Sequence, residues 1–381
     1  MSEREEIRGY HNVRAAARDY ETYSSDLLGD RDVRDYKAIP LEIDPPRHTL
    51  FREAVQPIFH SSHLEGKAPQ FEALARQLID DITARGGGDL VPDLGLRYVM
   101  GCLSIIYNRP QDLDEWLSWG PDVWTAEAYS KGMSVVESRR AARNRQFGEA
   151  SLRSGDMLYR YLERVFAEAT PAVGADPATT DVWDWIAGIR VNGEAPTREE
   201  TFGIAMLLLA GGRDTVIKLI VGIAWHLIRV PDDREYLREH PEAYNKAIAE
   251  LARYLSPIKQ MERLSSDPTR RALEQDDPRR YVLINWLSAN HDRSIWPDAD
   301  TIDIHRDRKP HVAFGIGRHS CMGMNITEFE AKAMISALVT QWPGWQLDGE
   351  PAIDWEQNGE GPDATIAVES FLSMPIRVVR G

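Results

Sequence analysis

Cysteine is scarce in this chain of 381 residues, which contains only Cys102 and Cys321. Two cysteines cannot form a framework of several disulfides or a four-cysteine zinc site. We expect both thiols to be reduced, because they lie far apart in a sequence that otherwise resembles cytoplasmic proteins.

The chain also lacks a long uncharged apolar run and an excess of positive charge. Its most apolar window, residues 202–228, is interrupted by Arg213, Asp214 and Lys218, so it offers no span of about 20 apolar residues to cross a membrane. Residues 1–21 have no apolar core of a signal peptide. The net charge of −15 argues against a broad nucleic-acid surface or a basic membrane anchor. These absences predict a soluble, cytoplasmic protein with no membrane insertion and no nucleic-acid partner.

Helical periodicity dominates the apolar pattern. It predicts helices over residues 68–84, 154–169, 198–229, 241–255 and 328–341. The helix over 198–229 is apolar nearly all round, so we expect it to cross the interior. Strand patterns are confined to 280–287 and 373–379, and a long irregular loop is expected over 297–310. The pattern predicts one mainly α domain with a small β portion.

The most informative segment is residues 311–323, with the sequence HVAFGIGRHSCMG. Gly315 and Gly317 permit tight turns, and Cys321 comes just before the helical run that starts at residue 324. Backbone N–H groups at a helix N-terminus stabilise a thiolate, and thiolates bind metals. A buried structural cysteine stays open as an alternative. A phosphate-binding loop would need a Gly-Lys-Ser/Thr ending, and a c-type haem site would need C-x-x-C-H.

This segment resembles the haem-binding signature of the cytochromes P-450. All six fixed positions are present, namely Phe314, Gly315, Gly317, His319, Cys321 and Gly323. The resemblance implies the cytochrome P-450 fold, with a helical lobe, a minor β-sheet region, and haem b between the long central helix and the cysteine loop. It implies that the Cys321 thiolate is the proximal ligand of the haem iron and that Phe314, His319 and Gly323 contact the cofactor.

The resemblance extends over about residues 8 to 380. Residues 9–26 resemble a part of the family fold that usually follows an opening helix and strand. We therefore expect residues 1–381 to form a single cytochrome P-450 domain that lacks the family's first helix and strand. The connection over 27–44 is also short, which shortens the expected substrate-access lid.

Glu250 and Arg253 form a Glu-x-x-Arg pair whose spacing places both charges on one helix face. Taken alone, the pair is typical of a surface ion pair of little energetic value. The resemblance instead implies a buried structural cluster that Arg306 completes from the loop before the cysteine.

The central helix contains Gly211-Gly212-Arg213-Asp214-Thr215, which matches the family pattern [AG]-G-x-[DE]-T. A charged side chain within an apolar helix is unfavourable unless something compensates for it. The resemblance implies that Asp214 and Thr215 are catalytic and relay protons to dioxygen at the haem. The alternative is a polar break where a long helix bends.

The haem propionates need cationic partners, and four residues match the family positions that supply them. His48 and Arg52 lie four residues apart on one face of an expected helix. Arg263 follows the Glu-x-x-Arg helix, and His319 lies within the cysteine motif. Each charge-assisted hydrogen bond would contribute about 1.5–3 kcal/mol. The alternative for each is a solvated surface side chain.

Substrate contacts are expected from motif position alone. We expect Leu207, Ala210 and Gly211 to face the distal pocket from the central helix. The segment before Arg263 lines the pocket in relatives and comprises Ile258, Lys259, Gln260 and Met261. Lys259 could hold a substrate carboxylate, with an outward-pointing lysine as the alternative.

No flavin, dinucleotide or iron–sulfur motif is found in the sequence, so electrons must come from a partner. The resemblance implies a ferredoxin and a ferredoxin reductase, which draw on NAD(P)H. Basic side chains near the cysteine loop could form the docking face, namely Arg306, Arg308, Lys309 and Arg318.

The resemblance implies an iron-binding oxidoreductase. We expect a haem-thiolate monooxygenase that activates O2 and hydroxylates or otherwise oxidises a small to medium organic substrate. The alternatives are an H2O2-dependent peroxygenase and a non-catalytic haem-binding or sensor protein.

Overall fold

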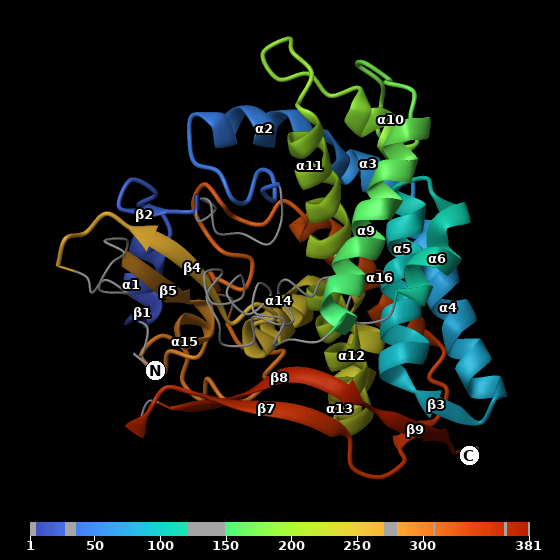
Figure 1. The fold of residues 1–381 in the computed structure, drawn as a ribbon. Helices are drawn as coiled ribbons and strands as arrows, with labels where there is room; N and C mark the ends of the chain where they lie inside the picture. The colour runs from blue at the N-terminus through green and yellow to red at the C-terminus, as the bar shows by residue number, and fades with distance from the viewer. Residues whose placement is uncertain are drawn as a thin grey trace.

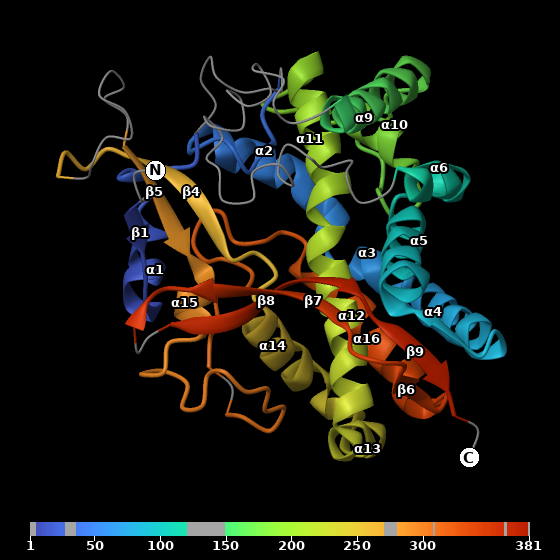
Figure 2. The ribbon, with the colours of Figure 1, turned by 60° about the horizontal axis from the view of Figure 1, so that its bottom comes forward.

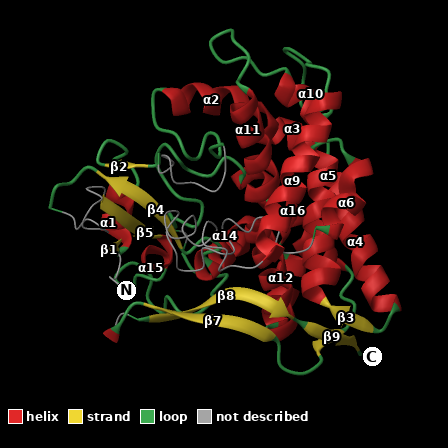
Figure 3. Ribbon diagram, in the orientation of Figure 1, coloured by secondary structure: helices red, strands yellow, loops and turns green. Residues whose placement is uncertain are grey.

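A computed structural model describes residues 5–26, 36–119, 149–269, 280–307, 309–361 and 364–379. Most of these residues are helical, and the strands lie along one side and one end of the molecule (Figures 1 and 3). The helices are α1 (Tyr10–Ala16), α2 (Arg47–Val55), α3 (Ser61–Glu65), α4 (Ala68–Ala84), α5 (Arg97–Ile106), α6 (Leu113–Ser118), α9 (Glu149–Glu168), α10 (Val182–Ala187), α11 (Arg198–Gly211), α12 (Asp214–Arg229), α13 (Pro231–Glu239), α14 (Tyr244–Leu255), α15 (Trp286–Asn290) and α16 (Met324–Thr340).

Three small sheets accompany the helices. The strands are β1 (Glu5–Ile7), β2 (Tyr23–Ser24), β3 (Gly87–Asp89), β4 (Gln260–Ser265), β5 (Arg280–Asn285), β6 (Trp345–Leu347), β7 (Ala352–Asn358), β8 (Thr365–Ser373) and β9 (Pro375–Val378). They form sheets in the orders β1-β5-β4-β2, β3-β9-β6 and β7-β8. Only β1 and β5 pair in parallel among the strands described. The mainly α fold with a small β portion is confirmed.

The main core lies where α12 and α16 pass through the middle of the helical part, and α16 packs against α4, α12 and α14. Figure 2 shows α11 and α12 running end to end through this centre, with the β7–β8 hairpin lying across α12 and α14. A smaller core fills the space between α1, β5 and α15, around Val13, Val282 and Trp286. The cysteine loop lies between these two cores, since Val312 belongs to the small one and Phe314 packs on the large one.

The expected helix over 68–84 is confirmed as α4, but the single helix expected over 198–229 is wrong. The structure has two helices there, α11 and α12, separated by Gly212 and Arg213. Arg213 has φ −101° and ψ −82°, outside the helical region. Thr215 donates from Oγ1 to the carbonyl of Gly211 at 3.2 Å, a side-chain bond that competes with the regular backbone pattern. Apolar periodicity does not detect such a break, because buried residues run nearly all round both helices.

Only β5 and β9 correspond to strands expected from the sequence, whereas β1, β2, β3, β4, β6, β7 and β8 were not expected. Strand β7 contains four acidic or amide side chains among seven residues and is exposed or half-exposed except at Asn358, so it has no apolar alternation. Its partner β8 supplies the pairing, with register shifts that bend the hairpin. The remaining expected elements correspond to α9, α14, α16, β5 and β9, and their ends differ from expectation by a few residues. The loop over 297–307 contains no helix or strand.

One carboxyl group lies in the main core. Glu330 of α16 is fully buried, and neither of its carboxyl oxygens has a hydrogen-bond partner among the described residues. Burial raises the pKa of Glu330 well above its ordinary value. Burial therefore favours the neutral form of this side chain in the folded protein.

We predict that Glu330→Gln makes folding less sensitive to pH. A carboxyl group whose folded pKa is raised stabilises the fold fully below its unfolded pKa, near 4.5, and this stabilisation is lost as pH rises toward the folded pKa. Over that window the free energy of unfolding of the original protein should fall by about 1.4 kcal/mol per pH unit relative to that of the variant. Urea unfolding followed by tryptophan fluorescence from pH 5 to pH 8 measures the difference. Parallel stability curves would contradict the prediction.

Candidate cofactor-binding site

An apolar cavity lies between the α11–α12 junction and the cysteine loop. Its empty space is about 1500 Å³, part of which is open to solvent. One wall comes from Leu207, Gly211 and Thr215 around the helix break, and the opposite wall from Phe314 and Cys321. The break therefore faces the only cysteine that the cavity contains among the residues described.

Local backbone geometry presents Cys321 to this cavity. Gly315 and Gly317 have φ of 64° and 82°, and a Cβ on Gly317 would lie 2.6 Å from the carbonyl oxygen of Ala17. The loop then closes through a hydrogen bond of 2.8 Å from the Cys321 amide to the carbonyl of Phe314. Cys321 is exposed, and its exposed surface faces the cavity. The glycines thus allow the close turn that the cysteine position requires.

The surroundings of Cys321 favour a metal ligand. Desolvation raises the pKa of the Cys321 thiol, whereas the backbone N–H groups of Gly323 and Met324 and the Arg52 guanidinium oppose this rise. Because α16 begins at Met324, these amides are the free donors expected at a helix N-terminus. A cation at the sulfur would complete the stabilisation of a thiolate.

All four residues expected to bind propionates line the cavity. His48 is buried, and neither of its ring nitrogens has a hydrogen-bond partner among the described residues. Its ring centroid lies 4.4 Å from that of His319. Burial, together with the charges of His319 and Arg52, lowers the pKa of His48 to about 4. Buried Arg263 also has a pKa lowered by desolvation, to about 10.

Arg52 connects α2 to the cysteine loop. Its guanidinium donates to the carbonyl oxygens of Arg318 and Ser320 at 3.1 and 2.9 Å. The α2 helix, which also carries His48, is thereby held beside Cys321.

Asp44 is a site residue that the sequence reasoning missed. Its carboxylate accepts from the Ser24 hydroxyl and, at 3.1 Å, from the Ser25 amide, and it lies 3.5 Å from Nε2 of His319. Burial acts to raise the pKa of Asp44, but the bonds from His319, Ser24 and Ser25 outweigh it and lower this pKa to about 2. The available signal was its place four residues before His48.

These residues fit a haem. The cavity combines a soft sulfur ligand with two buried imidazoles, one of them without partners, and two guanidinium groups. Carboxylates of a porphyrin would supply the missing hydrogen-bond partners of His48 and would compensate the buried charge of Arg263. Among the described residues, no group of three or more histidine, cysteine or acidic side chains could bind a metal on its own. A single protein ligand therefore suits a metal that brings its own macrocycle.

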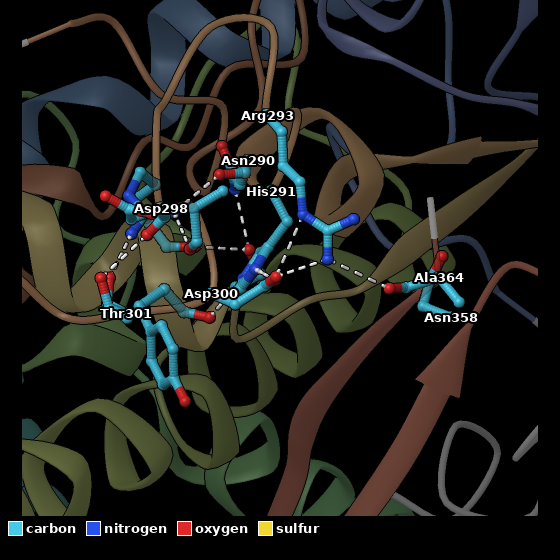
Figure 4. Close-up of polar contacts among 12 residues, drawn as sticks. Asn290, His291, Arg293, Asp298, Asp300, Thr301, Asn358 and Ala364 are labelled. Atoms are coloured by element: carbon cyan, nitrogen blue, oxygen red, sulfur yellow. Dashed lines mark hydrogen bonds and ion pairs between the residues drawn. The ribbon is translucent and has the colours of Figure 1, made fainter. Parts of the chain in front are cut away.

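The Glu-x-x-Arg pair is buried rather than solvated. Arg253 donates from Nε and Nη2 to Glu250 at 2.8 Å each, and Arg306 donates from Nε to the same carboxylate at 3.2 Å. Arg253 also donates to the carbonyls of Asn290 and Thr301 at 2.8 and 3.0 Å, and Figure 4 labels these two acceptor residues. The cluster thereby holds the long loop after α15.

This loop is also connected to the cysteine segment. The side chain of Asn290 accepts from the Val312 amide at 2.8 Å and donates to the Ser256 hydroxyl at 2.9 Å. Beside it, Asp300 pairs with His291 and, at 2.6 Å, with Arg293 (Figure 4). The start of the cysteine loop is therefore positioned by the buried cluster.

The two residues of the expected proton relay lie differently. Thr215 lines the cavity, whereas Asp214 is exposed and is not among the described residues on the wall. Arg213, which is buried, donates to Asp214 at 2.7 Å. Of the two relay residues, only Thr215 therefore lies on the cavity wall.

The expected substrate contacts divide into two groups. Leu207, Gly211, Ile258 and Met261 line the cavity, but Ala210, Lys259 and Gln260 are not among its described lining residues. Lys259 forms an ion pair with Glu356 of the β7–β8 hairpin. The structure therefore does not place Lys259 where a substrate carboxylate in the cavity could reach it.

The expected basic docking face is smaller than the sequence indicated. Arg306 is committed to Glu250, and Arg308 lies outside the described residues. Lys309 and Arg318 are exposed beside the cysteine loop.

Comparisons with known proteins agree with this geometry. A family model described as "Cytochrome P450" matches residues 276–343. A cytochrome P450 of Bacillus subtilis (strain 168) is 27% identical over 84% of this chain and 73% of its own length. A linalool 8-monooxygenase of Pseudomonas putida is 26% identical over 81% of this chain and 71% of its own length.

The solved structure of a carbohydrate active P450 superposes with a TM-score of 0.79 at 25% identity, covering 97% of this chain and 91% of that one. In the part of the chain that the structure describes, no helix has the length and apolar character needed to cross a membrane.

We predict that Glu250→Gln destabilises the fold strongly, because it leaves two guanidinium groups buried without their carboxylate. Removing one partner of a buried ion pair destabilises by about 3–5 kcal/mol. The matched control is Glu235→Gln, because Glu235 and Arg238 have the same spacing but are exposed. Urea unfolding should show a large decrease in the free energy of unfolding for Glu250→Gln and none for Glu235→Gln. Equal effects would contradict a buried structural role.

Proposed function

We propose that this chain, which belongs to the cytochrome P450 family, is a haem-thiolate monooxygenase that oxidises a small to medium-sized apolar organic molecule. The observation that carries the proposal is Cys321, which faces an apolar cavity at the N-terminus of α16 among four cationic or imidazole side chains. A structural cysteine would need neither the open cavity nor His48 without partners.

The proposed cofactor is haem b, held by this chain's own residues. Cytochromes P450 bind haem iron through a cysteine thiolate, and the bound haem supplies the chemistry of dioxygen activation. Cys321 would be the ligand here, and Phe314 and Gly323 would lie against the macrocycle. His48, Arg52, Arg263 and His319 would bind the propionates, with Asp44 orienting His319.

Thr215 and Asp214 are proposed to move protons into the cavity. The Thr215 hydroxyl gives its hydrogen to the Gly211 carbonyl, so its lone pairs can accept a proton or hold a water on the cavity side. Asp214 is exposed, so its carboxylate can take up protons from solvent. Arg213 holds this carboxylate at 2.7 Å and fixes its direction. The two side chains occupy the first two positions of α12, directly after the break.

An apolar substrate fits the wall best. Part of the cavity wall consists of apolar side chains such as Leu207, Ile258 and Met261, which exclude water and offer no hydrogen bonds. One relative is named for linalool and one similar structure for carbohydrate activity. A carbohydrate would leave many hydroxyl groups unpaired against this wall, which is unfavourable. We therefore favour a substrate with few polar groups.

Electrons are proposed to come from NAD(P)H through a ferredoxin reductase and a ferredoxin. The exposed Lys309 and Arg318 lie beside the cysteine loop and give a local positive face on an acidic protein. An acidic ferredoxin would dock there with a rate that falls as ionic strength rises.

We predict that Cys321→Ser abolishes the long-wavelength absorption band of the reduced, CO-bound haem protein, because a hydroxyl does not replace the thiolate. The matched control is Cys102→Ala, since Cys102 is the other cysteine and is buried away from the cavity. The control should keep the band. A band that persists in Cys321→Ser would overturn the proposed function.

We also predict that Thr215→Ala separates electron use from product formation. Loss of a proton-delivering group lowers the dependent step by about 10²–10⁴-fold. The assay uses a surrogate ferredoxin system and, from a set of apolar organic compounds, the one that gives the largest spin-state shift. More hydrogen peroxide should form per NAD(P)H consumed in the variant than in the original protein. Thr201→Ala is the control, because Thr201 makes the same bond to a carbonyl four residues earlier at the exposed end of α11. Unchanged peroxide release in Thr215→Ala would remove the proposed relay.

A further inference from the structure

The segment 36–41 packs directly on the N-terminal half of α11. Ala38 and Ile39 are buried, and the Ile39 amide donates to the carbonyl of Gly203 at 3.4 Å. The ring of Tyr36 meets that of Phe202 edge to face, with centroids 6.1 Å apart. The segment is therefore in contact with α11 through both its backbone and its side chains.

The contact continues into the next helix. Arg47 of α2 forms an ion pair with Glu200 of α11, and both views place α2 beside the upper part of α11 (Figures 1 and 2). Glu42, the residue directly after the segment, binds back to it: its carboxylate accepts from the Ala38 amide at 2.6 Å, and its amide donates to the Ala38 carbonyl at 2.8 Å. These bonds give the segment a compact shape of its own.

This close packing depends on Gly203. A Cβ at this position would lie 1.9 Å from the carbonyl oxygen of Lys37 and 3.4 Å from Cγ1 of Ile39. The obstacle is backbone rather than the end of a flexible side chain, so rotamer changes cannot relieve it. Any side chain at position 203 must push the segment away by about 1 Å.

The same segment forms part of the cavity wall. Ile39, Pro40 and Leu41 line the cavity, and so do Ile204, Leu207 and Leu208 of α11. The Gly203 contact lies where these two groups of lining residues meet. The distance between the two backbones at this contact therefore sets how closely residues 39–41 approach the lining residues of α11.

We propose that Gly203 is a specificity-determining position: its missing side chain lets residues 37–41 close against α11 and limits the cavity to compact apolar substrates. This inference rests on the proposed function, because it concerns the substrate space of the same cavity. Gly203 is not among the described residues that line the cavity, so it acts by positioning Ile39, Pro40 and Leu41.

The test compares Gly203→Ala with the original protein, using two nitrogen ligands of haem iron that differ in bulk, 4-phenylimidazole and clotrimazole. Absorption titrations give their dissociation constants, and unsubstituted imidazole reports on iron binding alone. We expect the preference to move toward clotrimazole on the order of tenfold, because the wall recedes from the small ligand and makes room for the large one. The binding of imidazole should stay the same.

Hydrogen–deuterium exchange provides a readout that does not depend on the haem. The Ile39 amide should exchange faster in Gly203→Ala, because its bond to the Gly203 carbonyl is stretched. Gly66→Ala is the matched control, since a Cβ on Gly66 would meet nothing within 4 Å. It should change neither the ligand preference nor the exchange of Ile39.

Ile39→Ala keeps the proposal testable if Gly203→Ala does not fold. It shortens the wall without touching the backbone contact, so it should shift the preference toward clotrimazole in the same direction. An unchanged preference in Ile39→Ala overturns the assignment of the wall and with it the role of Gly203.

The CO spectrum of each preparation separates the two hypotheses. A protein without the thiolate band overturns the proposed function. A protein that shows the band, with unchanged ligand preference and unchanged Ile39 exchange in Gly203→Ala, overturns the role of Gly203 alone.

Discussion

The buried carboxylate of Glu250 is the interaction on which the site depends. Two guanidinium groups share it, and both also donate to backbone carbonyls of the loop after α15. An ion pair in a region of low dielectric is favourable only when its remaining donors are satisfied, and here the loop satisfies them. The loop is therefore held by the cluster although it contains no helix or strand over 297–307. Through Asn290 this order reaches Val312 and the start of the cysteine loop.

The cavity brings opposite requirements together. One part of its wall is aliphatic and suits an apolar molecule, while another part consists of His48, Arg52, Arg263 and His319. Buried cations and imidazoles without partners are unfavourable in a folded protein, and their pKa values fall accordingly. An anionic group bound beside these four side chains would compensate their charge and supply the missing hydrogen-bond partners of His48. Asp44 compensates only part of this charge, through His319.

The break between α11 and α12 links fold and chemistry. In a continuous helix, the backbone amide of Thr215 would donate to the Gly211 carbonyl. The interruption at Gly212 and Arg213 instead leaves Thr215 on the cavity wall and Asp214 on the exposed side. Gly203, two turns earlier on α11, has a different use, because there the absent side chain admits a neighbouring backbone.

The sequence by itself predicted the residues that we propose carry chemistry, because each belongs to a short local pattern with a defined spacing. The position of Cys321 before a helix, the i, i+3 spacing of Glu250 and Arg253 and the polar group in an apolar helix can all be recognised from neighbours in sequence. Helix α4 was also predictable, since its apolar face repeats within one segment.

Only the tertiary structure decided which side chains meet across the chain. It paired Lys259 with Glu356 of a hairpin whose strands have no apolar alternation, and it placed Asp44 beside His319 and residues 37–41 against Gly203. These contacts join segments more than 90 residues apart, and they depend on packing distances that no local spacing encodes. The size of the cavity was decided in the same way, because it follows from how closely two backbones approach.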